Sequence, residues 1–357
     1  MKTVNNSGSD SENITGKSDM SYDVSVLVAT YHPSMAKLLV TLNSILVQRD
    51  ISYQIVITDD GSGDDFDIEK VKEFFKIKSF TDYEITQLAQ NEGTVNNVIN
   101  GLDYCYGEFV KPLSPGDYLY GEKVLSEWVG GMRKHGCVIG FSDDICYRYE
   151  EQTDGEQINT DKAPKVSADN FRLISIPTHP QKNHDFYRNS WSYNYLIFDD
   201  PARGAAVIVQ TDVLKKYLSS VKGLVIYAED VVYRMMAGAG ERAFFLGKGA
   251  ILYELGTGIS TNGESEWLRK IQADWDVSDE MMLDGDAIPD KALRAAFKLR
   301  TSAKKESSFI KRNMIMLRIP GKLRSVMDHR FHTRYTETKV NEDYIRKIHE
   351  TGISGGK

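Results

Sequence analysis

The chain is poor in cysteine and has no long apolar run. Cys105, Cys137 and Cys146 are its three cysteines, and their odd number and lack of CxxC spacing indicate neither a disulfide framework nor a zinc knuckle. No stretch approaches the ~18 uninterrupted apolar residues of a membrane-spanning helix, and residues 1–20 lack the apolar core of a signal peptide. We therefore expect a cytoplasmic protein, with residues 1–20 as a disordered tail.

Acidic residues outnumber basic ones overall, but basic residues gather in one late segment. The formal net charge of −7 argues against nucleic acid as a partner. Between residues 291 and 334, thirteen Lys and Arg accompany only two acids, Glu306 and Asp328, and apolar residues lie between them. Cationic charge combined with apolar contact is typical of helices at an anionic membrane surface. The alternative is that the apolar residues pack on the rest of the protein and the charges form a solvated face.

Apolar runs alternate with segments of helical periodicity through the first 141 residues, which predicts an α/β fold with a doubly wound, mostly parallel sheet. The predicted strands are 23–29, 54–58, 83–88, 108–113 and 137–141, with helices near 35–46, 68–77, 95–102 and 122–134. An acidic loop and an aromatic cluster interrupt this rhythm at about 150–203. A strand at 205–210, helices from 212 and 229, and one or two strands within 244–255 follow. From 264 onward the chain is polar and predicted to be helical, as an appendage to the sheet domain.

Polar residues follow the first two predicted strands at the point where each strand ends. Thr30 and Tyr31 end the first strand, and Asp59 and Asp60 end the second. Because the carboxyl ends of parallel strands meet at one edge of a sheet, where such folds bind ligands, these residues are candidates for a nucleotide site. Tyr31 would be a wall for the base, and the acids would contact its edge. The alternative is that Asp59 and Asp60 only cap the following turn.

Carboxylates also stand at two later positions. Asp117 follows the fourth strand, where it could hold Mg²⁺ or Mn²⁺ against a diphosphate, since these cations prefer oxygen ligands. Glu229 and Asp230 begin a helix and are candidates for the general base of a reaction at a hydroxyl. Plain alternatives exist for both places, namely a Pro-Gly turn at Pro115 and acids that stabilise the first turn of a helix.

Taken together, these segments resemble family 2 glycosyltransferases, the nucleotide-sugar-dependent enzymes of the GT-A fold. Six segments, in order, look like the family's opening strand, its "VVDDGS" segment, its "NxG" turn, its metal-binding "DxD", its "ED" pair and its late loop: 24–31, 57–62, 90–93, 113–117, 228–230 and 253–260. The chain departs from the family's "LDxDD" pattern, since Ser114 and Gly116 replace two of the acids and only Asp117 remains.

The resemblance implies an inverting transfer of a sugar from a nucleoside diphosphate, with UDP the commonest donor carrier. It implies catalysis by Asp230, with Glu229 as the other candidate, and a Mg²⁺ or Mn²⁺ ion at Asp117. Donor binding is implied for Thr30, Tyr31, Asp59, Asp60, Asn91, Gly93 and Ser260. The implied domains are a GT-A domain over 21–262, with an acceptor-side segment at about 150–203, and a helical, basic region over 263–357.

The family's bacterial surface-polysaccharide members suggest a saccharide or polyprenyl-linked acceptor. They also suggest that residues of about 291–334 hold the protein at the inner face of the cell membrane. Two alternatives stay open. A sugar nucleotidyltransferase would share the architecture, but it normally carries a Gly-rich, basic loop after its first strand, and residues 29–34 have none. A catalytically inactive binding subunit would explain Gly116.

Overall fold

The computed structural model describes residues 21–150, 165–177, 184–197, 204–255, 265–320 and 341–352. The predicted tail at 1–20, a large part of the predicted acceptor-side segment and Ser260 lie outside these residues.

The described elements follow the predicted alternation through the first half of the chain. The strands are β1 (Tyr22–Thr30), β2 (Tyr53–Asp59), β3 (Tyr83–Gln87), β4 (Gly107–Leu113), β5 (Tyr118–Leu119), β6 (Ile139–Tyr149), β7 (Phe171–Pro177), β8 (Val207–Gln210) and β9 (Ala243–Glu254). The helices are α1 (Met35–Leu46), α2 (Ile68–Ile77), α3 (Thr94–Leu102), α4 (Val124–His135), α5 (His184–Ile197), α6 (Thr211–Val221), α7 (Val231–Ala239), α8 (Ser265–Leu283), α9 (Lys291–Lys305), α10 (Phe309–Leu317) and α12 (Glu342–His349). No described helix is long and apolar enough to cross a membrane.

One sheet organises the described residues, with the strand order β3-β2-β1-β4-β8-β6-β9-β5 and with β7 paired to β6. The first four strands of this order are parallel, and β8 then joins β4 in the antiparallel sense. Thr30 of β1 is the register partner of Asp59 of β2, and Val28 is that of Leu113 of β4. The carboxyl ends of β1, β2 and β4 therefore meet at one edge, as the sequence predicts.

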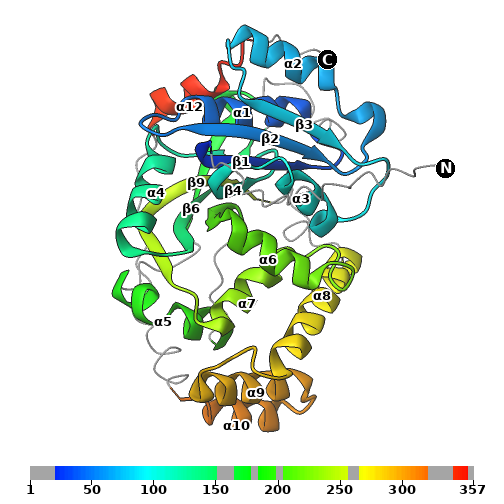
Figure 1. Ribbon diagram of the computed structural model, residues 1–357, viewed down its shortest axis with the longest axis vertical. Helices are drawn as coiled ribbons and strands as arrows, with labels where there is room; N and C mark the ends of the chain where they lie inside the picture. The colour runs from blue at the N-terminus through cyan, green and yellow to red at the C-terminus, as the bar shows by residue number, and fades with distance from the viewer. Residues whose placement is uncertain are drawn as a thin grey trace, which may run out of the picture.

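Helices cover both faces of the sheet, as alternation of side chains along a strand requires. On β1, Val26 and Val28 point into a core shared with α1, α2 and α4, whereas Leu27 points into a core shared with α3, α5, α6 and α7. Figure 1 shows the two layers, with α1 and α2 above the sheet and α6 and α7 below it. The α/β class predicted from the sequence is confirmed.

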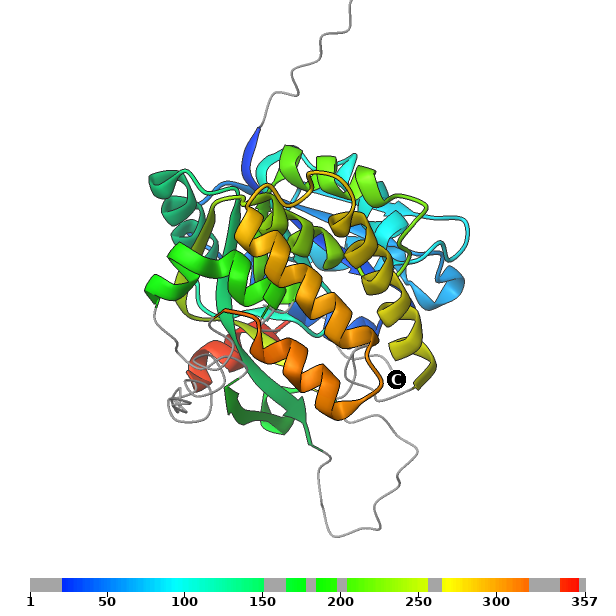
Figure 2. The ribbon, with the colours of Figure 1, turned by 90° about the horizontal axis from the view of Figure 1, so that it is seen from below.

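The helices of the predicted appendage go to two places. In Figures 1 and 2, α9 and α10 form the end of the molecule opposite α2, and α8 connects them to the region of α6 and α7. In contrast, α12 returns to the sheet domain and lies beside α1. There the hydroxyl of Tyr344 donates to the carbonyl of Leu119 at 2.6 Å, and the Asn43 amide donates to the carbonyl of Ile348 at 2.8 Å. The domain boundary at 262/263 stays a prediction.

The second half of the sheet differs from the predicted elements. β6 extends to Tyr149 rather than ending at Phe141, and β7 and α5 lie within the segment that interrupts the sequence pattern. Trp191 and Tyr195 of α5 are buried against Phe141, so these aromatic side chains belong to the core.

Candidate active site

The Asp60 carboxylate fixes the turn that precedes α3. Its two oxygens accept hydrogen bonds from the backbone N–H groups of Glu92 at 2.8 Å and Gly93 at 3.0 Å. Its own backbone N–H donates to the carbonyl of Thr30 at 2.9 Å. Asn91 closes the same turn, since its side-chain oxygen accepts from the Gly93 N–H. Thus Asp60, Asn91 and Gly93 form one hydrogen-bonded unit beside the ends of β1 and β2. Their part in donor binding stays a prediction.

Asp59 fixes a second turn at the same edge. Its buried carboxylate accepts from the backbone N–H and the hydroxyl of Ser62 and from the side-chain amide of Gln87. Gly61, in that turn, has a φ of +74°, and a Cβ there would lie 2.4 Å from the backbone of Gln90. The contacts of Asp59 are therefore those of the turn-capping alternative, and they hold the loop against the Asn91–Gly93 turn.

Thr30 and Tyr31 present different groups at this edge. The Thr30 side chain is buried, and its hydroxyl has no hydrogen-bond partner among the described residues. Tyr31 is 45% exposed, and its ring centroid lies 4.1 Å from that of His32. An exposed ring beside a fixed turn is available to contact a planar base.

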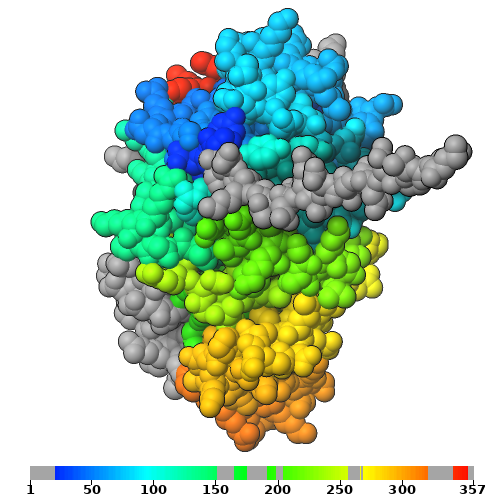
Figure 3. Space-filling model, in the orientation of Figure 1, coloured from blue at the N-terminus to red at the C-terminus, as the bar shows by residue number. Residues whose placement is uncertain are grey.

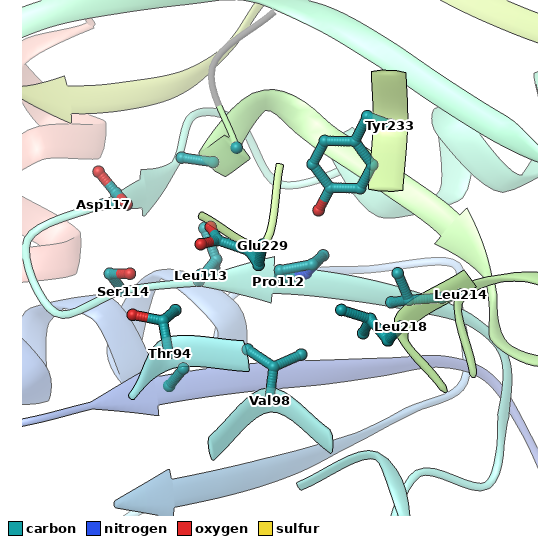
Figure 4. A pocket seen from close by; sticks show the side chains of 13 residues that line it. Thr94, Val98, Pro112, Leu113, Ser114, Asp117, Leu214, Leu218, Glu229 and Tyr233 are labelled. Carbon is teal, nitrogen blue, oxygen red and sulfur yellow. The ribbon is translucent and has the colours of Figure 1, made fainter. Parts of the chain in front are cut away.

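A cavity of about 50 Å³ opens beside these turns and joins strand ends to α3 and α7. Figure 4 shows Asp117, Ser114 and Glu229 around it, with the Tyr233 hydroxyl pointing toward the same space. Thr94, the residue after Gly93, also lines it. Hence two of the predicted acids, Asp117 and Glu229, line the same cavity.

The Glu229 carboxyl lies in an environment that suits proton transfer near neutral pH. Burial, with the charges of Asp230 and Asp117 adding to it, raises its pKa to about 7. A general base works best when its pKa lies near the working pH. Glu229 is half-buried and lines the cavity.

Asp230 is held by α8. The indole N–H of Trp275 donates to Asp230 Oδ1 at 3.0 Å. One carboxylate oxygen of Asp274 accepts from three successive backbone N–H groups just before the acidic pair, those of Ile226 at 3.2 Å, Tyr227 at 2.6 Å and Ala228 at 3.0 Å. The loop that carries Glu229 and Asp230 is therefore positioned by a helix that the sequence pattern assigns to the appendage.

The Asp117 region combines acids and cations that are largely withdrawn from solvent. Asp117 is half-buried, and desolvation of its carboxyl raises its pKa to about 7 against the opposing charge of Lys111, whereas burial lowers the pKa of Lys111 to about 7. The Lys111 ammonium donates to the carbonyl of Pro112 at 2.7 Å and to that of Ala205. Nearby, Lys37 donates to Glu254 at 2.7 Å, and both side chains are largely buried.

Glu254 stands where the loop lacks an acid. A Cβ at position 116 would lie 2.9 Å from Glu254 Oε2, so this carboxylate fills the space that a side chain there would take. No three acidic, histidine or cysteine side chains converge on a metal position in the described part of the chain. Mg²⁺, however, commonly uses one or two carboxylates and completes its shell with water and substrate phosphates. Asp117 and Glu254, whose charges act on one another, are the two carboxylates here that could ligate a cation of that kind, with Glu254 also paired to Lys37.

The structure thus brings together most of the residues that the sequence indicates. Thr30, Tyr31, Asp59, Asp60, Asn91 and Gly93 share one edge, and Asp117 and Glu229 line the cavity, with Asp230 next to Glu229. Ser260 lies outside the described residues. The sequence analysis missed Asp274, Trp275 and Glu254. Only the acidic Asp-Trp-Asp run of 274–276 is visible in the sequence, and it carries no motif.

Comparison with known proteins gives a family and a fold. Residues 25–197 match the model of the family described as glycosyl transferase family 2. Among solved structures, S. aureus TarS 1–349 in complex with UDP-GlcNAc is 17% identical with a TM-score of 0.50, over 85% of this chain and 81% of that chain. Another structure of S. aureus TarS 1–349 is 18% identical with a TM-score of 0.47, over 86% and 82%. No protein with a curated description matches the chain. The first likeness agrees with the fold class predicted from the sequence.

Proposed function

Since this chain belongs to glycosyl transferase family 2 through residues 25–197, we propose that it transfers a sugar, with inversion, from a UDP-sugar to a hydroxyl of a saccharide or polyprenyl-linked acceptor. The family makes the chain a glycosyltransferase. The donor, the acceptor and a role in surface polysaccharide synthesis are the parts that we propose. UDP-GlcNAc, the sugar nucleotide bound in the TarS complex, is the first donor to test.

One observation carries the proposal, namely the continuous connection between the two predicted halves of the site. Asp60 binds the Gly93 turn, and two residues further on the N–H of Val95 donates to the carbonyl of Ile226 at 3.0 Å. Ile226 belongs to the loop that leads to Glu229 and Asp230. A donor held at the turn would therefore lie beside the acids that act on the acceptor.

The reaction is a single in-line displacement at the anomeric carbon. A bond forms between the acceptor oxygen and this carbon while the bond to the diphosphate oxygen breaks. Asp230 takes the proton of the acceptor hydroxyl, and Glu229 is the other candidate for this role. Asp117 and Glu254 would hold Mg²⁺ or Mn²⁺, which when bound supplies positive charge for the leaving diphosphate. Backbone N–H groups of the turns add hydrogen bonds to developing charge.

The test is UDP release from UDP-GlcNAc, UDP-glucose and UDP-galactose, with simple glycosides and a polyprenyl-diphosphate saccharide as acceptors. Asp230→Asn keeps the shape of the side chain but removes its basic oxygen, so we expect UDP binding to persist and release to fall by about 10²–10⁴-fold. Asp276→Asn is the matched control, because Asp276 lies on the exposed side of α8 and bonds only to Gln272 in the described part of the chain. A purified protein that neither binds UDP nor releases it would contradict the proposal.

We place the protein at an anionic membrane surface through α10. Phe309, Ile310 and Leu317 are 68%, 71% and 65% exposed, more than any other large hydrophobic side chain in the described ranges, and Met314 lies on the same helix face. None of the α10 side chains is buried. In Figures 1 and 3 this helix forms the tip of the molecule, far from α2.

The charges beside this face suit an anionic bilayer. Lys311, Arg312 and Arg318 are exposed on or next to α10, and Lys304 and Lys305 end α9. Each such cation near an anionic leaflet contributes about 1 kcal/mol, and each buried apolar side chain adds to this. The chemistry of the face therefore matches a lipid surface rather than a purely apolar protein groove.

Substitutions in α10 test this membrane binding better than truncation does. A chain that ends before α10 would also lack α12, which packs on α1. We expect Phe309→Ser/Ile310→Ser to reduce co-sedimentation with vesicles that contain 30% phosphatidylglycerol by about tenfold or more. Ile77→Ser/Leu268→Ser, at exposed positions elsewhere, should leave it unchanged. Equal vesicle binding by the two double variants, or no vesicle binding by the unaltered protein, would refute membrane binding through α10.

A further inference from the structure

We propose that Trp275 and Asp274 of α8 are positioning residues for the Glu229–Asp230 pair: Trp275 orients the Asp230 carboxylate, and Asp274 fixes the backbone just before the two acids, of which Glu229 lines the cavity. The inference rests on the proposed transfer reaction. It assigns to α8, which the sequence pattern places in the appendage, a part in the chemistry of the sheet domain.

Trp275 acts on Asp230 through one directed hydrogen bond. The contact from its Nε1–H to Oδ1 is 3.0 Å long, so in the proposed reaction the other oxygen, Oδ2, would take the proton of the acceptor hydroxyl. The indole ring packs against the core on the α7 side of the sheet, so its N–H is held in one direction. An N–H donor on one oxygen favours the ionised carboxylate, which is the form that accepts a proton.

Asp274 acts on the backbone. Its Oδ2 accepts from three consecutive N–H groups, a pattern in which one carboxylate oxygen fixes a whole turn. Lys270, one turn earlier on α8, lies 5.5 Å from the ring centroid of Tyr227 in the same loop. Residues from two successive turns of α8 thus contact the segment immediately before Glu229.

The two residues act on Asp230 in opposite electrostatic senses. Burial raises the pKa of Asp230, the Trp275 hydrogen bond and the charge of Arg234 lower it, and the charge of Asp274 raises it. Among the described residues, the other titratable groups that face Asp230 are Glu229 beside it, Tyr233 on α7 and Tyr195 on α5. Loss of the Trp275 donor and loss of the Asp274 charge should therefore shift the titration of Asp230 in opposite directions.

Three variants test this inference. In Trp275→Phe we expect kcat to fall about tenfold, the donor KM to stay within about twofold, and the acid limb of the kcat profile to move up by about one pH unit, the size of one hydrogen bond to a charged group. In Asp274→Asn we expect a lower kcat, with the acid limb moved down. A loss of folding alone would move neither limb in a defined direction.

Trp191→Phe is the matched control. Its indole N–H donates to the carbonyl of Glu241 at 2.8 Å, and it packs in the same core. We expect a similar loss of stability and an unmoved pH profile. ¹³C NMR of the aspartate carboxyl carbons, with the Asp230 signal identified by Asp230→Asn, follows the same titration without turnover. If Trp275→Phe and Asp274→Asn leave the Asp230 midpoint in place, the inference is overturned. If the midpoint moves but no sugar nucleotide is consumed, it is the proposed function that fails.

Discussion

Glu254 Oε2 lies 2.9 Å from the place that a Cβ at Gly116 would take. The φ of Gly116 is +102°, which only glycine adopts readily, and its carbonyl accepts from the hydroxyl of Tyr147. The departure from the family's acidic pattern is therefore built into the local structure, with a carboxylate from β9 in place of a side chain on the loop.

This relationship predicts the cost of a side chain at position 116. We expect Gly116→Ala to lower the free energy of unfolding by about 2–4 kcal/mol, since backbone strain and a blocked carboxylate add. Gly63→Ala is the control, because Gly63 has a φ of +60° and nothing within 4 Å of its Cβ position, so it reports strain alone, at about 1–2 kcal/mol. Urea denaturation measures both losses in the free energy of unfolding. Equal losses would show that contact with Glu254 does not contribute to the effect at position 116.

Asp60→Ala should weaken donor binding in a folded protein. The Glu92 N–H loses its acceptor and the Gly93 N–H keeps only Asn91 Oδ1, so the turn loosens at the place where the nucleotide is expected. We expect the UDP affinity by calorimetry to fall about tenfold or more, the loss of one or two hydrogen bonds. Asp67→Ala removes a comparable carboxylate bond, from the Lys70 N–H at the start of α2, and should leave UDP binding unchanged. Wild-type affinity in folded Asp60→Ala would remove Asp60 from the donor site.

Asp117→Asn should raise the concentration of divalent cation that activity requires. One of the two oxygen donors that fit the ion loses its charge, so the half-saturating Mn²⁺ concentration should rise about tenfold or more. Electron paramagnetic resonance of Mn²⁺ in the presence of UDP measures the same affinity without turnover. Asp64→Asn, at an exposed acid of the Gly63–Asp65 turn, is the control. Full activity in excess EDTA would exclude a metal from the reaction.

Glu229→Gln should stabilise the protein at alkaline pH and not at acidic pH. The folded-state pKa of Glu229 is raised to about 7 from the ordinary 4.5 of a glutamate, so the folded protein holds a proton that the unfolded chain releases. That contribution is fully present below pH 4.5 and is lost as the pH rises to 7. Because Glu229 is half-buried, we expect a gain of about 1–2 kcal/mol at pH 8 and none at pH 4.5. Urea unfolding at the two pH values checks it, and the acidic measurement is the control.

The first half of the fold could be predicted from the sequence because its signals are local. The helix expected at 68–77 is α2 to the residue, and the expected 83–88 strand differs from β3 by one residue. α5 could not be predicted, since its sequence mixes polar and aromatic residues and its buried members pack on Phe141 of a distant strand. Packing between segments far apart in the chain decides such an element.

The candidate site shows the same division. Residues at strand ends can be identified once the strands are predicted, so Thr30, Asp60 and Asp117 could be selected as candidates from the sequence. That Asp60 binds a turn 32 residues later could not be read from spacing. Nor could the contact of Trp275 with Asp230, 45 residues apart, because no periodicity links the two.

The return of α12 to α1 has a consequence for synthesis of the chain. The side of α1 that α12 covers, where Asn43 binds the carbonyl of Ile348, stays exposed until residues 342–349 leave the ribosome. By then α1 itself has been outside for about three hundred residues of synthesis. At typical translation rates of about 5–20 residues per second, that interval lasts tens of seconds. During this interval the nascent sheet domain exposes the apolar side chains that α12 later covers, such as Val40 of α1, and a chaperone would bind it at that surface.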